Sequence, residues 1–170
     1  MEMNDQPDAI CRALNYGARF IEGEPLVKLG GLEAHEDSLM EVENLVIGAC
    51  GTSYYAGQFA EYLMRELEIF PFVQAKIASE ILEADLNELK NGCFLSVSQS
   101  GETMDLLIPF RKAKELGLKR LNVVNKVMST LAREEQCGVF LNCGRELSVA
   151  STKAFVSQVT VLCLVSLWFA

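Results

Sequence analysis

From residue 44 onward, short apolar runs alternate with longer segments of mixed polarity. The apolar runs have the length of β-strands and cover residues 45–49, 72–77, 93–97, 121–124 and 139–142. The segments between and after them predict helices over 54–68, 81–89, 103–116, 129–134 and 151–169. Strands that are apolar throughout and separated by helices are typical of a parallel sheet covered on both faces. With right-handed crossovers, the pattern predicts a three-layer α/β/α sandwich around a five-stranded, flavodoxin-like parallel sheet.

Residues 1–43 lack this alternation, and we expect them to form a helical lead-in that packs on a main domain spanning residues 44–170. Asp5 and Pro7 predict a helix start. Gly30-Gly31 is expected to break the chain before a short acidic helix at 33–41. At 170 residues, half of them hydrophobic, the chain is long enough for one domain with a substantial core.

Two helices carry further expectations. In the helix over 54–68, Phe59, Leu63 and Leu67 recur at helical spacing and predict a buried stripe. The segment 159–170 is mostly apolar but shorter than the roughly 20 residues that span a bilayer, so we expect a buried helix and no membrane association. The chain ends inside this helix without a polar terminus, as a fragment of a longer chain would.

The formal net charge of −8 argues against a nucleic-acid partner. None of the six cysteines forms a CxxC pair and His35 is the single histidine, so neither a metal site nor a cofactor is expected. Cys50 and Cys143 adjoin glycines and are candidates for reactive thiols, although buried core thiols are the favoured interpretation. The N-terminal segment has no secretion signal, which predicts a cytoplasmic protein with reduced thiols.

Hydroxyl side chains and glycines follow three of the predicted strands. The turns are Gly51-Thr52-Ser53, Ser98-Gln99-Ser100-Gly101-Glu102-Thr103, and a third that reaches Ser151-Thr152-Lys153. Ligands of open parallel sheets bind at the carboxyl ends of the strands, where helix N-termini favour anions. Together the turns predict a phosphate site, although the 98–103 turn alone is equally consistent with a simple helix cap. Neither the dinucleotide pattern GxGxxG nor the triphosphate pattern GxxxxGK[ST] is present.

Three motifs in this order resemble the glutamine–fructose-6-phosphate aminotransferase (glucosamine-6-phosphate synthase) family. They are Ala49-Cys50-Gly51-Thr52-Ser53-Tyr54, the 98–103 turn, and Val149-Ala150-Ser151-Thr152-Lys153-Ala154-Phe155. The resemblance is to the first of two sugar isomerase (SIS) domains in that family, which makes amino sugars. It implies that the chain binds fructose 6-phosphate or glucosamine 6-phosphate.

The resemblance also implies roles for individual residues. The phosphate would be held by Ser98, Gln99, Ser100 and Thr103. The sugar would be lined by Thr52, Ser53, Val149 and Ser151, with Gly51, Glu102 and Lys153 as further candidates. The glutaminase domain and the second SIS domain, which carries the family's isomerisation base and Schiff-base lysine, have no counterpart here. No catalytic residue is therefore expected in this chain.

Two alternatives remain open. The chain could be a stand-alone aldose–ketose phosphate isomerase with Glu102 or Glu146 as its base, in a site completed by a second subunit. It could also be a non-catalytic phosphosugar sensor, although residues 1–43 are short and acidic for a DNA-binding domain. Whichever function holds, we expect a homodimer, driven by the apolar helix at 154–170 and by the exposed end that a missing partner domain leaves.

Overall fold

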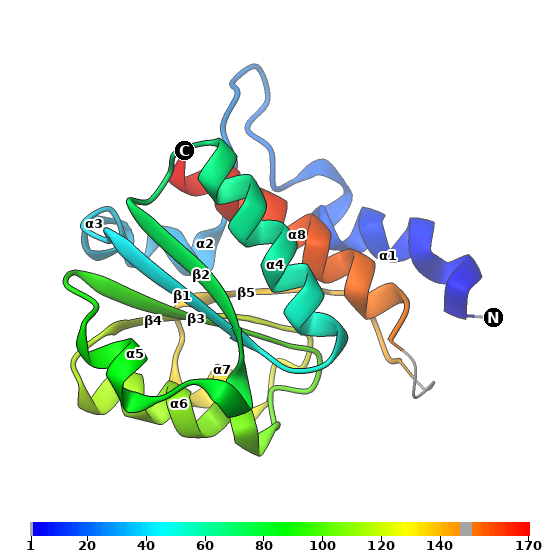
Figure 1. Ribbon diagram of the computed structural model, residues 1–170. Coiled ribbons are helices and arrows are strands. Elements are labelled where there is room, and N and C mark those ends of the chain that lie inside the picture. Colours follow the sequence, from blue (N-terminus) through cyan, green and yellow to red (C-terminus); the bar gives the residue numbers. More distant parts are fainter. Residues whose placement is uncertain (1, 147–150) are drawn as a thin grey trace.

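The structure, a computed structural model, describes residues 2–146 and 151–170 and contains within them one five-stranded sheet. All strands run parallel, in the order β2-β1-β3-β4-β5 (Figure 1). The strands are β1 (Asn44–Ala49), β2 (Phe72–Ile77), β3 (Gly92–Ser98), β4 (Lys119–Val124) and β5 (Gly138–Phe140). This is the flavodoxin-like order. The predicted fold class is confirmed.

The helices cover both faces of this sheet. One face carries α4 (Thr52–Glu66) and α8 (Lys153–Phe169), with α1 (Gln6–Ala13) packed on α8 (Figure 1). The other face carries α5 (Glu83–Asn87), α6 (Met104–Glu115) and α7 (Thr130–Glu134). The remaining short elements are α2 (Gly30–Glu33), α3 (Glu36–Leu39) and the 3-10 helices η1 (Glu2–Asp5), η2 (Asn15–Gly17) and η3 (Ala78–Glu80). The helix predicted at 81–89 is thus only the short α5.

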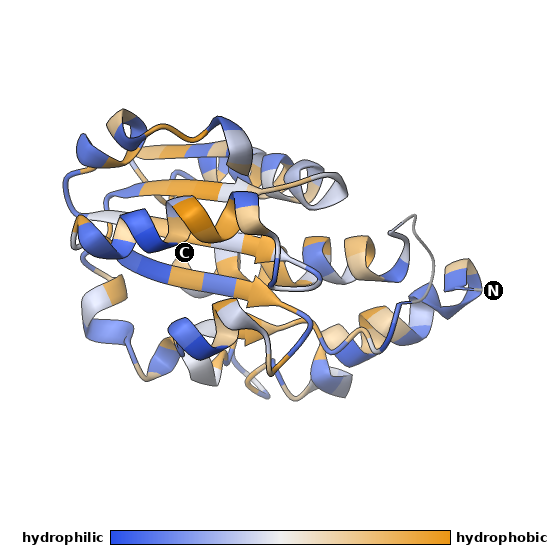
Figure 2. Ribbon diagram, turned by 90° about the horizontal axis from the view of Figure 1, so that it is seen from below, coloured by the Kyte–Doolittle hydropathy of each residue, from blue (hydrophilic) through white to orange (hydrophobic). Residues whose placement is uncertain are grey.

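Each face of the sheet has its own core. Leu45 and Ile47 of β1 pack on the side of α4 and α8, whereas Val46 packs on the side of α6. Successive strand residues point to opposite faces, so a strand buried on both sides is hydrophobic at most positions, with exceptions such as the buried Ser96 and Asn122. Figure 2 shows this as long hydrophobic stretches along the strands and mixed colours along the helices.

Helix α4 faces the sheet with small residues rather than with the large residues that its sequence suggested. The predicted stripe of large residues is wrong, because Phe59 and Leu67 are 42% and 44% exposed. The buried side of α4 instead consists of Ser53, Ala56, Gly57, Ala60 and Met64. A Cβ added at Gly57 would lie 3.1 Å from the Ile47 side chain, so small residues allow the helix backbone to approach β1.

The lead-in is anchored to the main fold through α1. Ala9 and Ala13 of this helix are fully buried, and Arg12 donates to the backbone oxygens of Asn142 and Cys143 beyond β5. Asp5 is the N-cap residue of α1, as predicted, but its side chain makes no capping hydrogen bond. Gly30-Gly31 was expected to break the chain and instead begins α2. The division into residues 1–43 and 44–170 stays a prediction.

Helix α8 is part of the core, as the sequence predicts. Val161, Leu162 and Val165 are fully buried against the sheet side that also holds α4. None of the described helices is both long and apolar enough to cross a membrane. Part of the apolar surface of α8 is buried in the core while Leu167 is 51% exposed, and the homodimer expected from this helix stays a prediction.

Candidate functional site

A small cavity lies at the carboxyl end of β3, where the sequence predicts the phosphate site. Its volume is about 130 Å³. The lining residues come from the end of β1, the first turn of α4, the end of β3 and the first turn of α6, and they are Cys50, Ser53, Val97, Ser98, Gln99, Ser100, Thr103 and Leu106. Four of these, Ser98, Gln99, Ser100 and Thr103, are the predicted phosphate-binding set. The structure therefore brings that set together with Ser53.

The 98–103 turn is shaped by its own serines. Ser98 Oγ accepts a hydrogen bond from the backbone N–H of Gly101 at 2.9 Å, and Ser100 Oγ accepts one from Glu102 N–H at 3.2 Å. Gly101 has φ +66°, a left-handed conformation that glycine adopts without strain. Both serine oxygens act as acceptors inside the turn, so each hydroxyl retains a proton that it can donate to a ligand.

Thr103 is the N-cap residue of α6, but its side chain makes no capping hydrogen bond. A simple helix cap would place the hydroxyl on the N–H groups of the first turn. Thr103 instead lines the cavity, at the helix end where the macrodipole favours an anion. The simple-cap interpretation of this turn therefore has no support from the geometry.

The turn after β1 contributes one of its two hydroxyls. Gly51 has φ +57° and directs the chain into α4. Ser53 is buried, and its Oγ accepts a hydrogen bond from Gln158 Nε2 of α8 at 2.8 Å. Thr52 is exposed and is not among the residues that line the small cavity.

The two glutamates considered as catalytic bases both bind helix starts. Glu102 accepts from the N–H and the hydroxyl of Thr130, which begins α7. These bonds lower the pKa of Glu102, so its carboxylate is ionised at neutral pH and weakly basic. Glu146 Oε1 accepts from Thr152 N–H at 2.8 Å and from Ala154 N–H at 3.3 Å, at the start of α8. Glu102 therefore lacks the environment of a tuned base, whose pKa is raised toward neutrality, and Glu146 Oε1 is engaged by two backbone N–H groups.

The third motif is described only in part. Val149 lies outside the described residues, and Ser151 is half-buried before α8. Lys153 is buried, and its ammonium lies 3.3 Å from Asp5 Oδ2 of the lead-in. The structure thus pairs Lys153 with a carboxylate of the chain itself.

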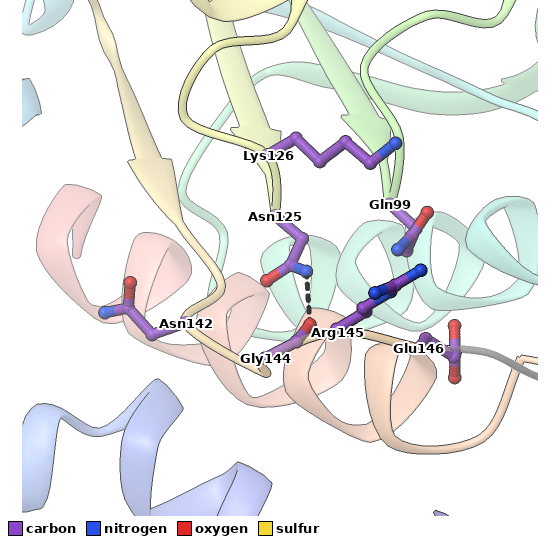
Figure 3. A pocket seen from close by; sticks show the side chains of 7 residues that line it. All are labelled: Gln99, Asn125, Lys126, Asn142, Gly144, Arg145 and Glu146. Carbon is purple, nitrogen blue, oxygen red and sulfur yellow. Dashed lines mark hydrogen bonds between the residues drawn. The ribbon is translucent and has the colours of Figure 1, made fainter.

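A second, larger cavity of about 830 Å³ adjoins the small one through Gln99. Its lining comes from the loops after β3, β4 and β5 and consists of Gln99, Asn125, Lys126, Asn142, Gly144, Arg145 and Glu146 (Figure 3). Asn125 joins two of these loops, because it donates to Gly144 O at 2.7 Å and accepts from Cys143 N–H at 3.1 Å.

The sequence analysis missed Lys126 and Arg145, which bring positive charge to this cavity in an acidic chain. Their position in the loops that follow β4 and β5 is the signal that could have identified them, because ligands of such sheets bind beyond the strand ends. Neither cation belongs to a motif of hydroxyls and glycines, the pattern from which the site was predicted. Both side chains are exposed.

Comparison with known proteins connects this geometry to a family. The SIS domain family model matches residues 38–166. The isomerizing glutamine–fructose-6-phosphate aminotransferase 1 of Rattus norvegicus is 36% identical over 166 residues, which are 98% of this chain and 24% of that protein. The corresponding enzyme of Chlorobaculum tepidum is 38% identical over 166 residues, 98% of this chain and 26% of that protein.

A solved structure agrees with these relatives. The C-terminal domain of glucosamine-fructose-6-phosphate aminotransferase from Francisella tularensis superposes with a TM-score of 0.84 at 30% identity. The match covers 99% of this chain and 46% of that one. The chain thus spans about a quarter of the length of the two aminotransferases, and about half of the solved domain.

Proposed function

The chain belongs to the SIS domain family. We propose that it binds a phosphorylated hexose, either fructose 6-phosphate or glucosamine 6-phosphate. The observation that carries the proposal is the small cavity in which Ser98, Gln99, Ser100 and Thr103 meet at the N-terminus of α6. The names of the relatives make fructose 6-phosphate the first candidate, and the family resemblance adds glucosamine 6-phosphate.

The phosphate would be held by hydroxyl protons and the helix end rather than by a cluster of cations. The oxygens of Ser98 and Ser100 are occupied by backbone N–H groups, which leaves their protons to point at phosphate oxygens. Charge-assisted hydrogen bonds of this kind are roughly twice as strong as neutral ones. Lys126 and Arg145, in the adjoining cavity, would add a local positive potential in an otherwise acidic protein.

The sugar would extend from this phosphate toward Thr52, Ser53, Val149 and Ser151. Ser53 lies in the same cavity, and the other three remain proposals from the resemblance. Gly51 would allow close approach of the ligand at the start of α4. Glu102 would support the turn from outside through Thr130, and Lys153 would support α8 through Asp5.

Within the relatives' reaction, this chain would supply ligand binding and no catalytic residue. The alternative of a stand-alone isomerase needs a free base, and both candidate glutamates accept hydrogen bonds from backbone N–H groups. A coupled isomerase assay on the purified chain, with Glu102→Gln and Glu146→Gln variants, distinguishes the two functions. Turnover that disappears in either variant would favour the isomerase.

We also propose a cytoplasmic homodimer. Tyr55, Phe59 and Tyr62 of α4 are 62%, 42% and 62% exposed and lie at helical spacing on one side of that helix. An exposed apolar stripe of this kind is typical of an interaction surface. Sedimentation equilibrium at micromolar concentration tests the dimer, and a monomer there would contradict it.

Calorimetric titration tests the binding function directly. The wild-type chain should bind fructose 6-phosphate or glucosamine 6-phosphate and should not bind glucose, which lacks the phosphate. Ser100→Ala should weaken binding by roughly 10-fold or more, the effect of one hydrogen bond to a charged group. Ser38→Ala, a change at an exposed serine on α3, should leave the affinity unchanged. Absence of binding at millimolar sugar phosphate would refute the proposal.

A further inference from the structure

Gln158 is a polar residue in the middle of the most apolar helix of the protein. It lies one turn before Val161 and Leu162 of α8, and its side chain is fully buried. Its amide nitrogen donates a hydrogen bond of 2.8 Å to Ser53 Oγ, a residue 105 positions away in the sequence. This bond joins α8 to the first turn of α4, and the two helices lie side by side in Figure 1.

The other end of the same amide is unsatisfied. Gln158 Oε1 is buried and has no hydrogen-bond partner among residues 2–146 and 151–170. A buried carbonyl without a partner is unfavourable, and an apolar side chain of similar size would avoid that cost. Residues that lower stability by burying an unsatisfied polar atom are expected where function requires them. The contribution of Gln158 that an apolar residue could not make is therefore the hydrogen bond from Nε2 to Ser53.

The direction of this bond determines what Ser53 can do. An amide –NH₂ group only donates, so Ser53 Oγ must accept. A serine hydroxyl carries one proton, and among the described residues that proton has no protein acceptor. Ser53 lines the small cavity together with Ser98, Ser100 and Thr103.

We propose that Gln158 is a positioning residue that holds Ser53 as a hydrogen-bond donor to an anionic ligand in the small cavity. The inference rests on the proposed function, because the ligand is the phosphorylated sugar, and it moves Ser53 from the sugar contacts to the phosphate contacts. It gives Ser53 the same arrangement as Ser98 and Ser100, whose oxygens also accept from N–H donors. Three hydroxyls around one cavity would then all be set to donate, which suits a phosphate that offers only acceptors.

The experiment compares Gln158→Met, Ser53→Ala and the double variant of the full chain. Methionine keeps the approximate volume of glutamine, removes the donor and also removes the unpartnered oxygen. We expect Gln158→Met to weaken binding of fructose 6-phosphate and of inorganic phosphate by roughly 10-fold, as expected when one hydrogen bond to a charged group is lost. Its thermal midpoint should not fall, because the unsatisfied oxygen is gone. Gln158→Leu provides a second variant of the same chemistry if the methionine variant does not fold.

The double variant separates positioning from a structural role. If Gln158 acts through Ser53, the double variant should bind no more weakly than Ser53→Ala alone. Ser166→Ala is the matched control, because Ser166 is also buried in α8 but donates within its own helix, to Leu162 O. It should leave the affinity unchanged.

Two results would overturn the inference while the proposed function survives. The first is wild-type affinity in Gln158→Met and Gln158→Leu. The second is independent losses that multiply to about 100-fold in the double variant. A wild-type chain that binds neither fructose 6-phosphate nor inorganic phosphate overturns the proposed function, and this inference with it.

Discussion

The carboxylate of Glu102 accepts two hydrogen bonds from Thr130, one from its backbone N–H at 2.8 Å and one from its hydroxyl at 2.7 Å. Glu102 belongs to the turn that lines the small cavity, and Thr130 is the first residue of α7. Leu131 N–H also donates to Gly101 O, at 3.2 Å. The turn after β3 is therefore fastened to the helix after β4, and its shape depends on both.

The Glu102–Thr130 contact should make stability depend on pH. The hydroxyl and N–H of Thr130 lower the pKa of Glu102 in the folded protein below its ordinary value of 4.5. A carboxylate with a lowered folded-state pKa stabilises the fold above pH 4.5, and that stabilisation is lost as the pH falls through the folded-state pKa. Glu102→Gln should be less stable than wild type at pH 7, with a difference that shrinks below pH 4.5.

Urea unfolding at a series of pH values measures this difference. Glu22→Gln, a change at an exposed carboxylate of the lead-in, is the control. If the free energies of unfolding of wild type and Glu102→Gln differ by the same amount from pH 7 to pH 3, the charge of Glu102 contributes nothing to the stability of the fold.

Gly101→Ala should destabilise the protein more than the same change at another left-handed glycine. A Cβ at Gly101 would lie 2.3 Å from Ser129 Oγ and 2.5 Å from Ser129 Cβ, so backbone strain and a steric clash add together. Gly117 has a similar φ, +72°, but a Cβ there meets nothing within 4 Å. We expect a loss of about 1 kcal/mol at Gly117 and about 2–4 kcal/mol at Gly101, measured by denaturant unfolding. Equal losses would mean that Ser129 moves aside freely.

Lys153 should contribute to stability through Asp5 rather than to ligand affinity. Its side chain is 9% exposed, so Asp5→Asn leaves a nearly buried ammonium without its carboxylate and should cost about 1–3 kcal/mol. Adding Lys153→Met to that variant should recover part of the loss, because the unpaired charge is removed. Lys153→Met alone should bind fructose 6-phosphate as wild type does. A weaker affinity would place Lys153 at the ligand.

Most thiols of the folded protein should react slowly with alkylating reagents. Burial raises the pKa of Cys137 to about 12 and that of Cys143 to about 11, and it also raises the pKa of Cys50 and Cys163. Thiolate is the reactive form, so little of it is present at pH 8. Iodoacetamide followed by peptide mass spectrometry should modify the exposed Cys11 first. Rapid labelling of Cys50 would contradict this prediction and show that the cavity is open to solvent reagents.

The fold was predictable because the strands are buried on both faces. Val46 and Ile47 of β1, and Phe94 and Leu95 of β3, are consecutive large hydrophobic residues that are all buried, as a parallel sheet covered on both faces requires. The orientation of α4 was not predictable in the same way. Its buried side is made of Ala56, Gly57 and Ala60, and the small size of these residues matters only beside a neighbour that the sequence does not reveal.

The hydroxyl turns could be found from the sequence because parallel strands deliver their carboxyl ends to one edge. The role of Glu102 could not, because its partner Thr130 begins α7, whose position beside the 98–103 turn depends on the whole fold. The contact of Glu146 with Thr152 N–H, six residues later, is local and was not predicted either. Gln158 was missed for a related reason. A single amide within an apolar helix has no local signature, and its partner Ser53 lies 105 residues earlier.

The contact between Asp5 and Lys153 joins residues separated by 148 positions. Helix α1 buries Ala9 and Ala13 next to α8, which follows all five strands of the sheet in the sequence. During translation the apolar side of α1 therefore stays uncovered until the sheet and α8 have left the ribosome. Contacts of such long sequence separation slow folding. Helix α1 is therefore made before the sheet but can dock only after α8.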